Sequence, residues 1–321
     1  MSDTPVEARG LVKRYGRITA VDHVDLTVNR GDVYGFLGPN GAGKTTALRM
    51  MLGLIYPTAG TVRLFGRDPI TEGAAALEGV AGFVEAPRFY PYMTARTNMR
   101  MMAAYDGDEA AARIDEALET VELSGRADDK VGGYSHGMRQ RLGIAAALLR
   151  QPKLMLLDEP ATGLDPGGMR DMRTLIRRLA DDGMTVLLSS HLLAEVEGLC
   201  DRVAIVRAGQ IVYEGAIAEL KASAESAYRL RTSDNATALG VCAAQPGVAS
   251  ARIEGADIRM EAGTSTIGEL SVALVEANLQ ITALVPESAT LEDLFFRLTE
   301  GATPGEIEVP ARPAGVVGGG K

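Results

Sequence analysis

The sequence predicts an α/β protein in which a largely parallel core sheet carries a nucleotide-binding loop, followed by a small α+β domain with a ferredoxin-like fold. Three observations lead to this prediction. A glycine-rich phosphate-binding pattern at 38–46 lies between an apolar run and a helical segment. Further apolar runs alternate with helical segments up to about residue 200, as in parallel sheets. After residue 220 the order of segments changes to β-α-β-β-α-β.

The N-terminal residues are expected to form short antiparallel strands that lead into the phosphate-binding pattern. Residues 6–28 alternate β-like runs with turns, and the turn at 29–32 precedes a short apolar run at 33–37. That run is predicted to be a buried strand. Tyr15 lies at one of the earlier turns, where an isolated aromatic residue is more often a packing residue than a ligand contact.

The segment 38–46 has the spacing G-x-x-x-x-G-K-[ST], which is typical of a loop that holds phosphate. Its glycines let the backbone curl, so that successive N–H groups and the N-terminus of the next helix face an anion. Lys44 is expected to reach the outer phosphates, and the Thr45 hydroxyl is expected to ligate Mg²⁺. A glycine-rich turn that binds nothing is the alternative, and the placement between strand and helix disfavours it. The predicted nucleotide-binding residues are Gly38, Pro39, Asn40, Gly41, Ala42, Gly43, Lys44, Thr45 and Thr46.

The middle of the chain is predicted to alternate strands and helices, with a helical insertion. Two prolines predict a loop at 85–92, and the segment 94–123 has helical spacing with a break near 106–108. Ser135 is a good N-cap for a helix that runs to Arg150. The other predicted elements are strands at 60–66, 80–84, 153–158 and 184–189, helices at 46–52, 166–180 and 192–200, and a hairpin at 203–213.

The C-terminal part is predicted to be a separate domain with its own core. Its strands are expected at 227–231, 249–253, 258–261 and 281–285, and its helices at 236–244, 266–277 and 291–299. From Gly301 the chain is rich in Pro, Gly and Ala without periodicity, which predicts a disordered tail. The predicted domains are 1–220, with a helical subdomain at about 86–150, then 221–300, and the tail at 301–321.

Composition limits the classes of function. A formal charge of −9 over 321 residues argues against a nucleic-acid partner, because no broad basic surface is needed to account for the sequence. The N-terminus has no basic region followed by an apolar core, and no run approaches the ~18 apolar residues of a membrane span. Cys200 and Cys242 lie in segments with helical spacing and are expected to be reduced core residues of a cytosolic protein, without a metal.

An acidic pair follows the apolar run at 153–158. Phosphoryl transfer needs Mg²⁺, positioning and an oriented water more than it needs covalent chemistry. Asp158 is predicted to hold Mg²⁺, and Glu159 to act as general base on the attacking water. Acids at a strand end are common taken singly, but a phosphate-binding loop in the same chain favours the catalytic interpretation.

Three further segments resemble the ATP-binding subunits of ABC transporters. Tyr-Ser-His-Gly-Met-Arg-Gln-Arg at 134–141 precedes the acidic strand, Gly-Leu-Asp at 163–165 follows it, and Ser-His at 190–191 follows the next strand. This is the order in the family, and the resemblance covers about residues 6–217. It implies a P-loop NTPase of the ABC type, with a parallel core sheet, an antiparallel β subdomain and a helical subdomain.

The resemblance assigns roles to residues outside the phosphate-binding loop. It implies that Tyr15 stacks on adenine, and that Ser135 and Gly137 belong to a signature loop that faces the γ-phosphate bound by a second subunit. Asp165 would lie at the dimer seam, and His191 would contact the γ-phosphate and hold the attacking water. A lone subunit would therefore hold ATP in half a site, and a head-to-tail homodimer would have two composite sites.

Two departures from the family pattern bear on the chemistry of the site. The signature normally resembles Leu-Ser-Gly-Gly-Gln, and Met138 replaces the final amide, so Ser135 and backbone N–H groups must carry the contact to nucleotide. Glu85 lies where the family usually has Gln. A carboxylate can ligate Mg²⁺ but cannot donate an N–H. We therefore expect Glu85 to keep a metal contact and to couple the nucleotide site to a membrane protein that partners this chain.

The segments 85–98 and 291–295 resemble a subgroup of drug and antibiotic exporters whose partners are ABC-2-type permeases. This implies a Mg-ATP-hydrolysing subunit that powers efflux of an antibiotic, peptide or lipid through a separate permease. It would bind peripherally, through that permease, at the cytoplasmic face of the cell membrane. In this subgroup the C-terminal extension has a regulatory or dimer-supporting role, although 291–299 could equally be an ordinary docking helix. The alternatives are a soluble ABC-type ATPase without a permease and an ATP-binding regulatory protein.

Overall fold

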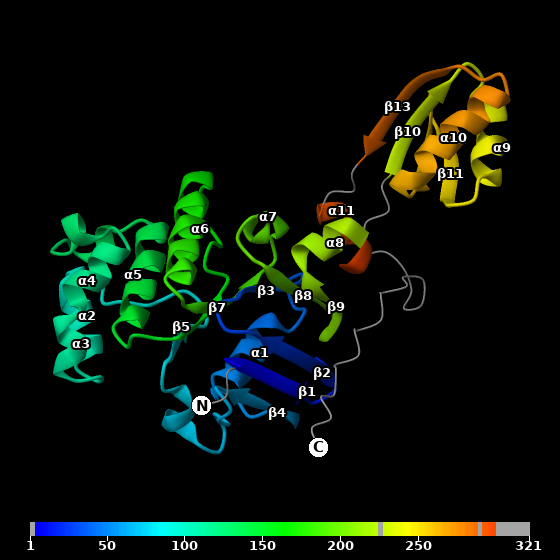
Figure 1. Ribbon diagram of the computed structural model, residues 1–321. Helices are drawn as coiled ribbons and strands as arrows, with labels where there is room; N and C mark the ends of the chain where they lie inside the picture. Colours follow the sequence, from blue (N-terminus) through cyan, green and yellow to red (C-terminus); the bar gives the residue numbers. More distant parts are fainter. Residues whose placement is uncertain (1–3, 224–226, 288–290, 300–321) are drawn as a thin grey trace, which may run out of the picture. The chain divides into compact units, whose positions relative to one another are not determined.

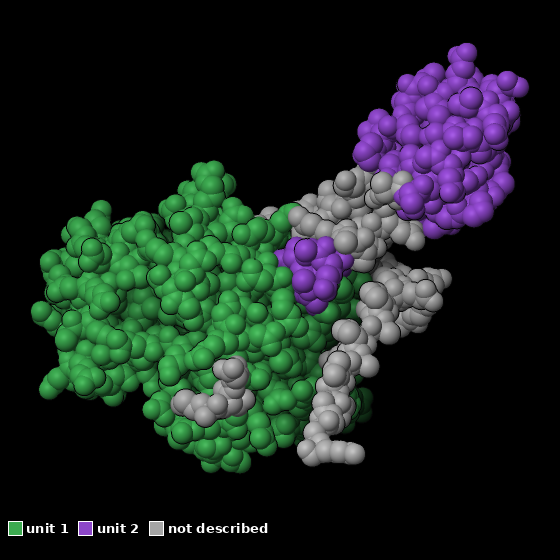
Figure 2. All heavy atoms as spheres, in the orientation of Figure 1, with its two compact units in different colours: residues 1–214, 296–321 green, residues 215–295 purple. Residues whose placement is uncertain are grey.

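The computed structural model describes residues 4–223, 227–287 and 291–299 (Figure 1). Within these ranges the chain divides into two compact units (Figure 2). One contains the described parts of 1–214 and 296–321, and the other those of 215–295. The predicted tail at 301–321 lies outside the described residues.

The first unit is organised around a six-stranded sheet in the order β5-β6-β7-β3-β8-β9. The pairs β5–β6, β6–β7, β7–β3 and β3–β8 are parallel, which confirms the predicted parallel core sheet. Every residue of β3, β6 and β7 is buried, as expected for strands covered on both faces. The strands are β3 (Val33–Leu37), β5 (Val80–Phe83), β6 (Leu154–Asp158), β7 (Thr185–Ser190), β8 (Arg202–Arg207) and β9 (Gln210–Ala216).

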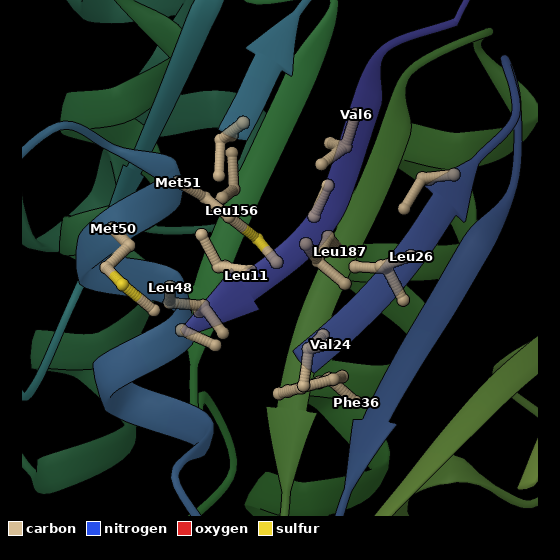
Figure 3. Packing of buried hydrophobic residues seen from close by; sticks show 14 of the residues in the cluster. Val6, Leu11, Val24, Leu26, Phe36, Leu48, Met50, Met51, Leu156 and Leu187 are labelled. Carbon is tan, nitrogen blue, oxygen red and sulfur yellow. The ribbon is translucent and has the colours of Figure 1, made fainter. Parts of the chain in front are cut away.

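A second, antiparallel sheet covers the phosphate-binding end of this unit. Its middle strand β1 (Val6–Tyr15) pairs with β2 (Ile18–Val28) on one side and β4 (Ala59–Leu64) on the other. The helix α1 (Lys44–Met51) packs between the two sheets. Figure 3 shows the shared core, in which residues of both sheets and α1 meet: Leu11, Leu26, Leu48, Leu156 and Leu187, each at most 1% exposed. Burial of these side chains stabilises the position of α1, and with it the loop that precedes α1.

The helical insertion gathers at one end of the first unit (Figure 1). The segment 94–123 is helical as expected, but it forms three short helices where a single break predicts two: α2 (Ala95–Ala103), α3 (Asp108–Ala112) and α4 (Ile114–Thr120). The predicted break near Gly107 is present, with Gly107 at φ 88°. A second break follows at Arg113, whose Nε donates to the Leu149 carbonyl at 2.9 Å, a contact that spacing alone does not reveal.

The remaining helices of this unit are α5 (His136–Leu148), α6 (Pro166–Asp181) and α7 (Leu193–Val196), with 3₁₀ turns η1 (Gly73–Leu77), η2 (Ser124–Arg126) and η3 (Val131–Gly133). The predicted N-cap is confirmed, since the Ser135 hydroxyl accepts the Met138 N–H at 3.2 Å. The helix expected at 192–200 is too long, because α7 ends at Val196 and Gly198 follows at φ 76°. Cys200 is therefore outside a helix, although it is buried and free as expected.

The second unit has the strand order β11-β12-β10-β13, and its pairs are antiparallel. Together with the chain order β10-α9-β11-β12-α10-β13, this confirms the predicted ferredoxin-like arrangement. Its core joins the sheet to α9 and α10, with Leu230, Ile258, Met260 and Leu274 at most 1% exposed. The elements of this part of the chain are α8 (Ile217–Ser223), β10 (Ala227–Thr232), α9 (Asn235–Ala244), β11 (Val248–Glu254), β12 (Asp257–Ala262), α10 (Thr264–Glu276), β13 (Ile281–Glu287) and α11 (Leu291–Thr299).

None of the described helices combines the length and apolar character that a membrane span requires.

Candidate nucleotide-binding site

The phosphate-binding loop connects β3 to α1, and its glycines are needed for steric reasons. Gly43 has φ 101°, and a Cβ there would lie 2.1 Å from the Ala20 carbonyl oxygen. At Gly38 a Cβ would lie 2.4 Å from the Val206 carbonyl oxygen. Larger residues at either position would displace the loop from the neighbouring backbone, so the glycines fix the path of the chain into α1.

Lys44 is the first residue of α1 and is only 4% exposed. Its Nζ donates to the Gly38 carbonyl at 2.8 Å and the Pro39 carbonyl at 3.2 Å, so the ammonium lies inside the curve of its own loop. A positive charge within a glycine cradle at a helix N-terminus is the chemistry that polyphosphate requires.

A cavity of about 190 Å³ opens at this loop. Most of the predicted phosphate-binding residues line it, together with Glu159 from the end of β6. Ala20 also lines it, although no sequence motif marks that residue. The lining residues are Ala20, Asn40, Gly41, Gly43, Lys44, Thr45, Thr46 and Glu159. The loop and the catalytic candidate therefore face one space.

Ser189, at the end of β7, positions the acidic pair. Asp158 lies opposite Ser189 in the parallel register, and the Ser189 hydroxyl donates to Asp158 Oδ1 at 2.5 Å. The same hydroxyl accepts the backbone N–H of Glu159 at 2.9 Å. Ser189 is fully buried and was not predicted as a site residue. The only indication of Ser189 in the sequence is that serines end the apolar run just before His191, as acidic residues end the run at 153–158.

The Glu159 carboxylate is engaged by three groups. Oε2 accepts the Thr162 hydroxyl at 2.8 Å and Nδ1–H of His191 at 3.0 Å, and Oε1 lies 3.4 Å from Lys44 Nζ. Partial burial raises the pKa of Glu159, but the Thr162 hydrogen bond and the charges of Lys44 and His191 outweigh it. The pKa is therefore below its usual value, and the carboxylate is ionised near neutral pH. The structure thus brings His191 and Glu159 together, a contact that the sequence did not predict.

The residues fit a metal ion only when the nucleotide supplies further ligands. Within the described ranges, no group of three or more His, Cys, Asp or Glu residues could hold a metal by itself. The Thr45 hydroxyl and the Asp158 carboxylate are oxygen donors of the kind Mg²⁺ shares with phosphate and water. Glu85 does not line the cavity; its side chain is 61% exposed and pairs with Arg49 of α1.

The predicted signature residues lie at a different cavity, of about 450 Å³. Ser135 and Gly137 at the N-terminus of α5, and Asp165 at the N-terminus of α6, line it. Met138 does not line it, and its backbone N–H is capped by Ser135. Tyr15 lines neither cavity; its ring is half exposed, with Lys13 Nζ 5.0 Å from the ring centroid.

The fold and this loop define an ATP-binding cassette protein, and comparison with known proteins agrees. The family model described as ABC transporter matches residues 21–162. The bacitracin transport ATP-binding protein BcrA of Bacillus licheniformis is 38% identical over 94% of this chain and 99% of its own length. The daunorubicin/doxorubicin resistance ATP-binding protein DrrA of Streptomyces peucetius is 36% identical over 92% of each chain.

A solved structure shows the same fold. The ADP conformation of MJ1267, an ATP-binding cassette of an ABC transporter, superposes with a TM-score of 0.62 at 28% identity, over 67% of this chain and 92% of the other. The chain belongs to the ATP-binding proteins of ABC transporters, and it is an ATPase that binds ATP. The relatives named for bacitracin and daunorubicin confirm the resemblance to drug and antibiotic exporters.

Proposed function

We propose that this chain is the ATP-hydrolysing subunit of an exporter that works through a separate ABC-2-type permease at the cytoplasmic face of the cell membrane. Relatives named for bacitracin transport and for daunorubicin/doxorubicin resistance are similar over more than nine-tenths of the chain, which supports an antibiotic, peptide or lipid as cargo. The absence of a spanning helix among the described residues is compatible with a permease on another chain.

The observation that carries the mechanism is the separation of two half-sites on one chain. The cavity at the phosphate-binding loop and the cavity at Ser135, Gly137 and Asp165 share no lining residue. A second copy placed head to tail would bring the signature cavity of one subunit against the phosphate-binding loop of the other. We therefore infer a homodimer with two composite sites, and we assign the C-terminal domain at 221–300 a dimer-supporting or regulatory role.

Five of the predicted residues act at the phosphate groups and the attacking water. Bound Mg²⁺, held by Thr45 and Asp158, would neutralise phosphate charge. Lys44 exchanges its contacts with Glu159 and the loop carbonyls for the outer phosphates. That exchange frees one oxygen of the Glu159 carboxylate to take a proton from water, while His191 keeps its hold on the other oxygen. Without nucleotide, the Glu159 carboxylate remains paired with Lys44.

The loop at 85–92 is the surface we assign to the permease. Tyr90 and Tyr92 are at least half exposed, with ring centroids 5.8 Å apart. The loop is nevertheless fixed, because buried Asn98 accepts the Tyr90 N–H at 2.8 Å and donates to the Tyr90 carbonyl at 3.1 Å. Exposed aromatic rings on an anchored loop are typical of protein contacts. Through its pairing with Arg49, Glu85 would connect this loop to α1 and the nucleotide.

The test is affinity purification of tagged Glu159→Gln protein with Mg-ATP from gently solubilised membranes of its native host. Blocked hydrolysis should hold the closed complex together, so a polytopic membrane protein is expected in the eluate. The matched control adds Lys44→Ala, which should abolish recovery because nucleotide no longer binds. A Tyr90→Ala/Tyr92→Ala variant should bind ATP and lose the permease. Recovery of soluble partners alone would contradict the proposal and favour a soluble ATPase.

A further inference from the structure

His136 occupies the position where the signature loop of the family normally has glycine. It is the first residue of α5, and its Nε2 lies 3.1 Å from the Thr162 carbonyl oxygen. A carbonyl oxygen can only accept, so Nε2 must carry a proton and donate. This hydrogen bond joins two segments 26 residues apart in the sequence.

Packing around this bond ties the N-terminus of α5 to the segment 162–164. Gly163 has φ 77°, and a Cβ added there would lie 3.5 Å from His136 Nε2, so the imidazole occupies the space beside the Gly163 backbone. One residue further along α5, a Cβ added at Gly137 would lie 3.4 Å from the side chain of Leu164. The N-terminus of α5 and the segment 162–164 are therefore close neighbours, and the hydrogen bond from His136 to Thr162 is the contact that links them.

The same segment holds the catalytic carboxylate. The Thr162 hydroxyl donates to Glu159 Oε2 at 2.8 Å, and the Thr162 backbone N–H donates to the Glu159 carbonyl at 3.2 Å. His191 contacts the same carboxylate oxygen. A continuous chain of contacts therefore runs His136–Thr162–Glu159–His191 within one subunit.

We propose that His136 is a positioning residue that acts through Thr162 to set the position of the Glu159 carboxylate in its own subunit. The inference rests on the proposed homodimer for its consequence. There, the signature loop of a subunit faces nucleotide held by its partner, whereas Glu159 serves the nucleotide held by that subunit itself. The contacts therefore couple the two composite sites: engagement of the α5 N-terminus at one site adjusts the general base at the other.

Mixed dimers separate this role from direct contact with nucleotide. In the first dimer, one subunit carries His136→Leu with native Glu159, and the other carries Glu159→Gln. In the second dimer, His136→Leu is placed in the Glu159→Gln subunit instead. Two affinity tags allow each mixed dimer to be isolated, and the ATPase rate is measured.

We expect kcat of the first dimer to fall about fivefold, which is the effect of losing one neutral hydrogen bond. We expect kcat of the second dimer to equal that of a dimer in which both subunits have His136 and one carries Glu159→Gln. His136→Gln, which retains a donor of similar reach, should restore the rate. The surface variant His23→Asn is the control, because it removes an imidazole that contacts Asp22 and asparagine tolerates the φ of 51° at this position. A larger loss in the second dimer, or equal rates in both, would overturn the proposal.

A second measurement needs neither a dimer nor turnover. The chain contains three histidines, so full-length protein with ¹⁵N-labelled histidine gives three sets of ring signals by NMR. Without nucleotide, His136→Leu and Thr162→Ala should both shift the His191 Nδ1 signal, because the Glu159 carboxylate moves, whereas His136→Gln should not. An unchanged His191 signal in His136→Leu would overturn the proposal. If the native chain hydrolysed no ATP, the proposed function would fail, and this experiment would still decide the role of His136.

Discussion

Ser189→Ala tests how the parallel sheet builds the catalytic end of β6. The substitution removes a hydroxyl that is fully buried, donates to Asp158 at 2.5 Å and accepts the Glu159 N–H at 2.9 Å. Alanine fits the space without strain, because it is smaller than serine and keeps the same backbone. The change therefore acts on two hydrogen bonds, and only a small part of the effect comes from packing.

The magnitude follows from these two bonds. A hydrogen bond to a charged group contributes about 1.5–3 kcal/mol, and a neutral bond adds about 1 kcal/mol. Since the Glu159 N–H and one oxygen of Asp158 lose their Ser189 partner, we expect the free energy of unfolding of the first unit to fall by about 3 kcal/mol. Release of both acidic residues from their fixed geometry should also lower kcat by about 10- to 100-fold.

The assay pairs steady-state ATP turnover with urea unfolding, and Thr185→Val is the matched control. Thr185 lies on the same strand and is equally buried, and its hydroxyl accepts the Gly31 N–H at 3.0 Å, but it is at the far end of β7 from the acids. The free energy of unfolding of Thr185→Val should fall by about 1 kcal/mol, and its kcat should be unchanged. If Ser189→Ala kept kcat within about twofold, or Thr185→Val lost as much, the positioning role of Ser189 would be refuted.

Three further predictions concern the loop, pH and the thiols. Gly43→Ala should abolish ATP binding and destabilise the chain, because its Cβ would lie 2.1 Å from a backbone oxygen. Gly41→Ala has open space around its Cβ at φ 82°, so its free energy of unfolding, measured by thermal unfolding, should fall by only about 1 kcal/mol. Folding lowers the pKa of Glu159 from its ordinary value of 4.5. The ionised carboxylate therefore stabilises the fold at pH values above 4.5, and this stabilisation is lost as the pH falls through the lowered pKa. The melting temperature of the native chain should therefore fall more steeply than that of Glu159→Gln below pH 4.5; parallel curves would contradict this. Burial raises the pKa of Cys200 and Cys242, so a thiol reagent should react slowly with native protein and label both residues in urea; rapid native labelling would show that they are accessible.

The sequence by itself determined the features whose chemistry is local along the chain. The phosphate-binding loop depends on glycine, lysine and threonine at fixed spacing between a strand and a helix. Ser135 caps the helix that begins at His136 by accepting the N–H of Met138, three residues downstream. The alternation of apolar runs with helical segments specified the parallel sheet, because such strands are buried on both faces. The order of segments after residue 220 specified the ferredoxin-like unit in the same way.

Only the tertiary structure decided which distant polar groups meet. Strand register places Ser189 beside Asp158, and helix packing places His136 against Thr162, across separations of 31 and 26 residues. The tertiary structure also pairs Glu85 with Arg49. It adds a second break at Arg113, after the predicted break near 106–108, and the Arg113 side chain reaches the end of α5. Hydrophobic periodicity cannot specify such contacts, because it records which face of an element is buried, whereas hydrogen-bond partners depend on the distances between elements in the folded chain.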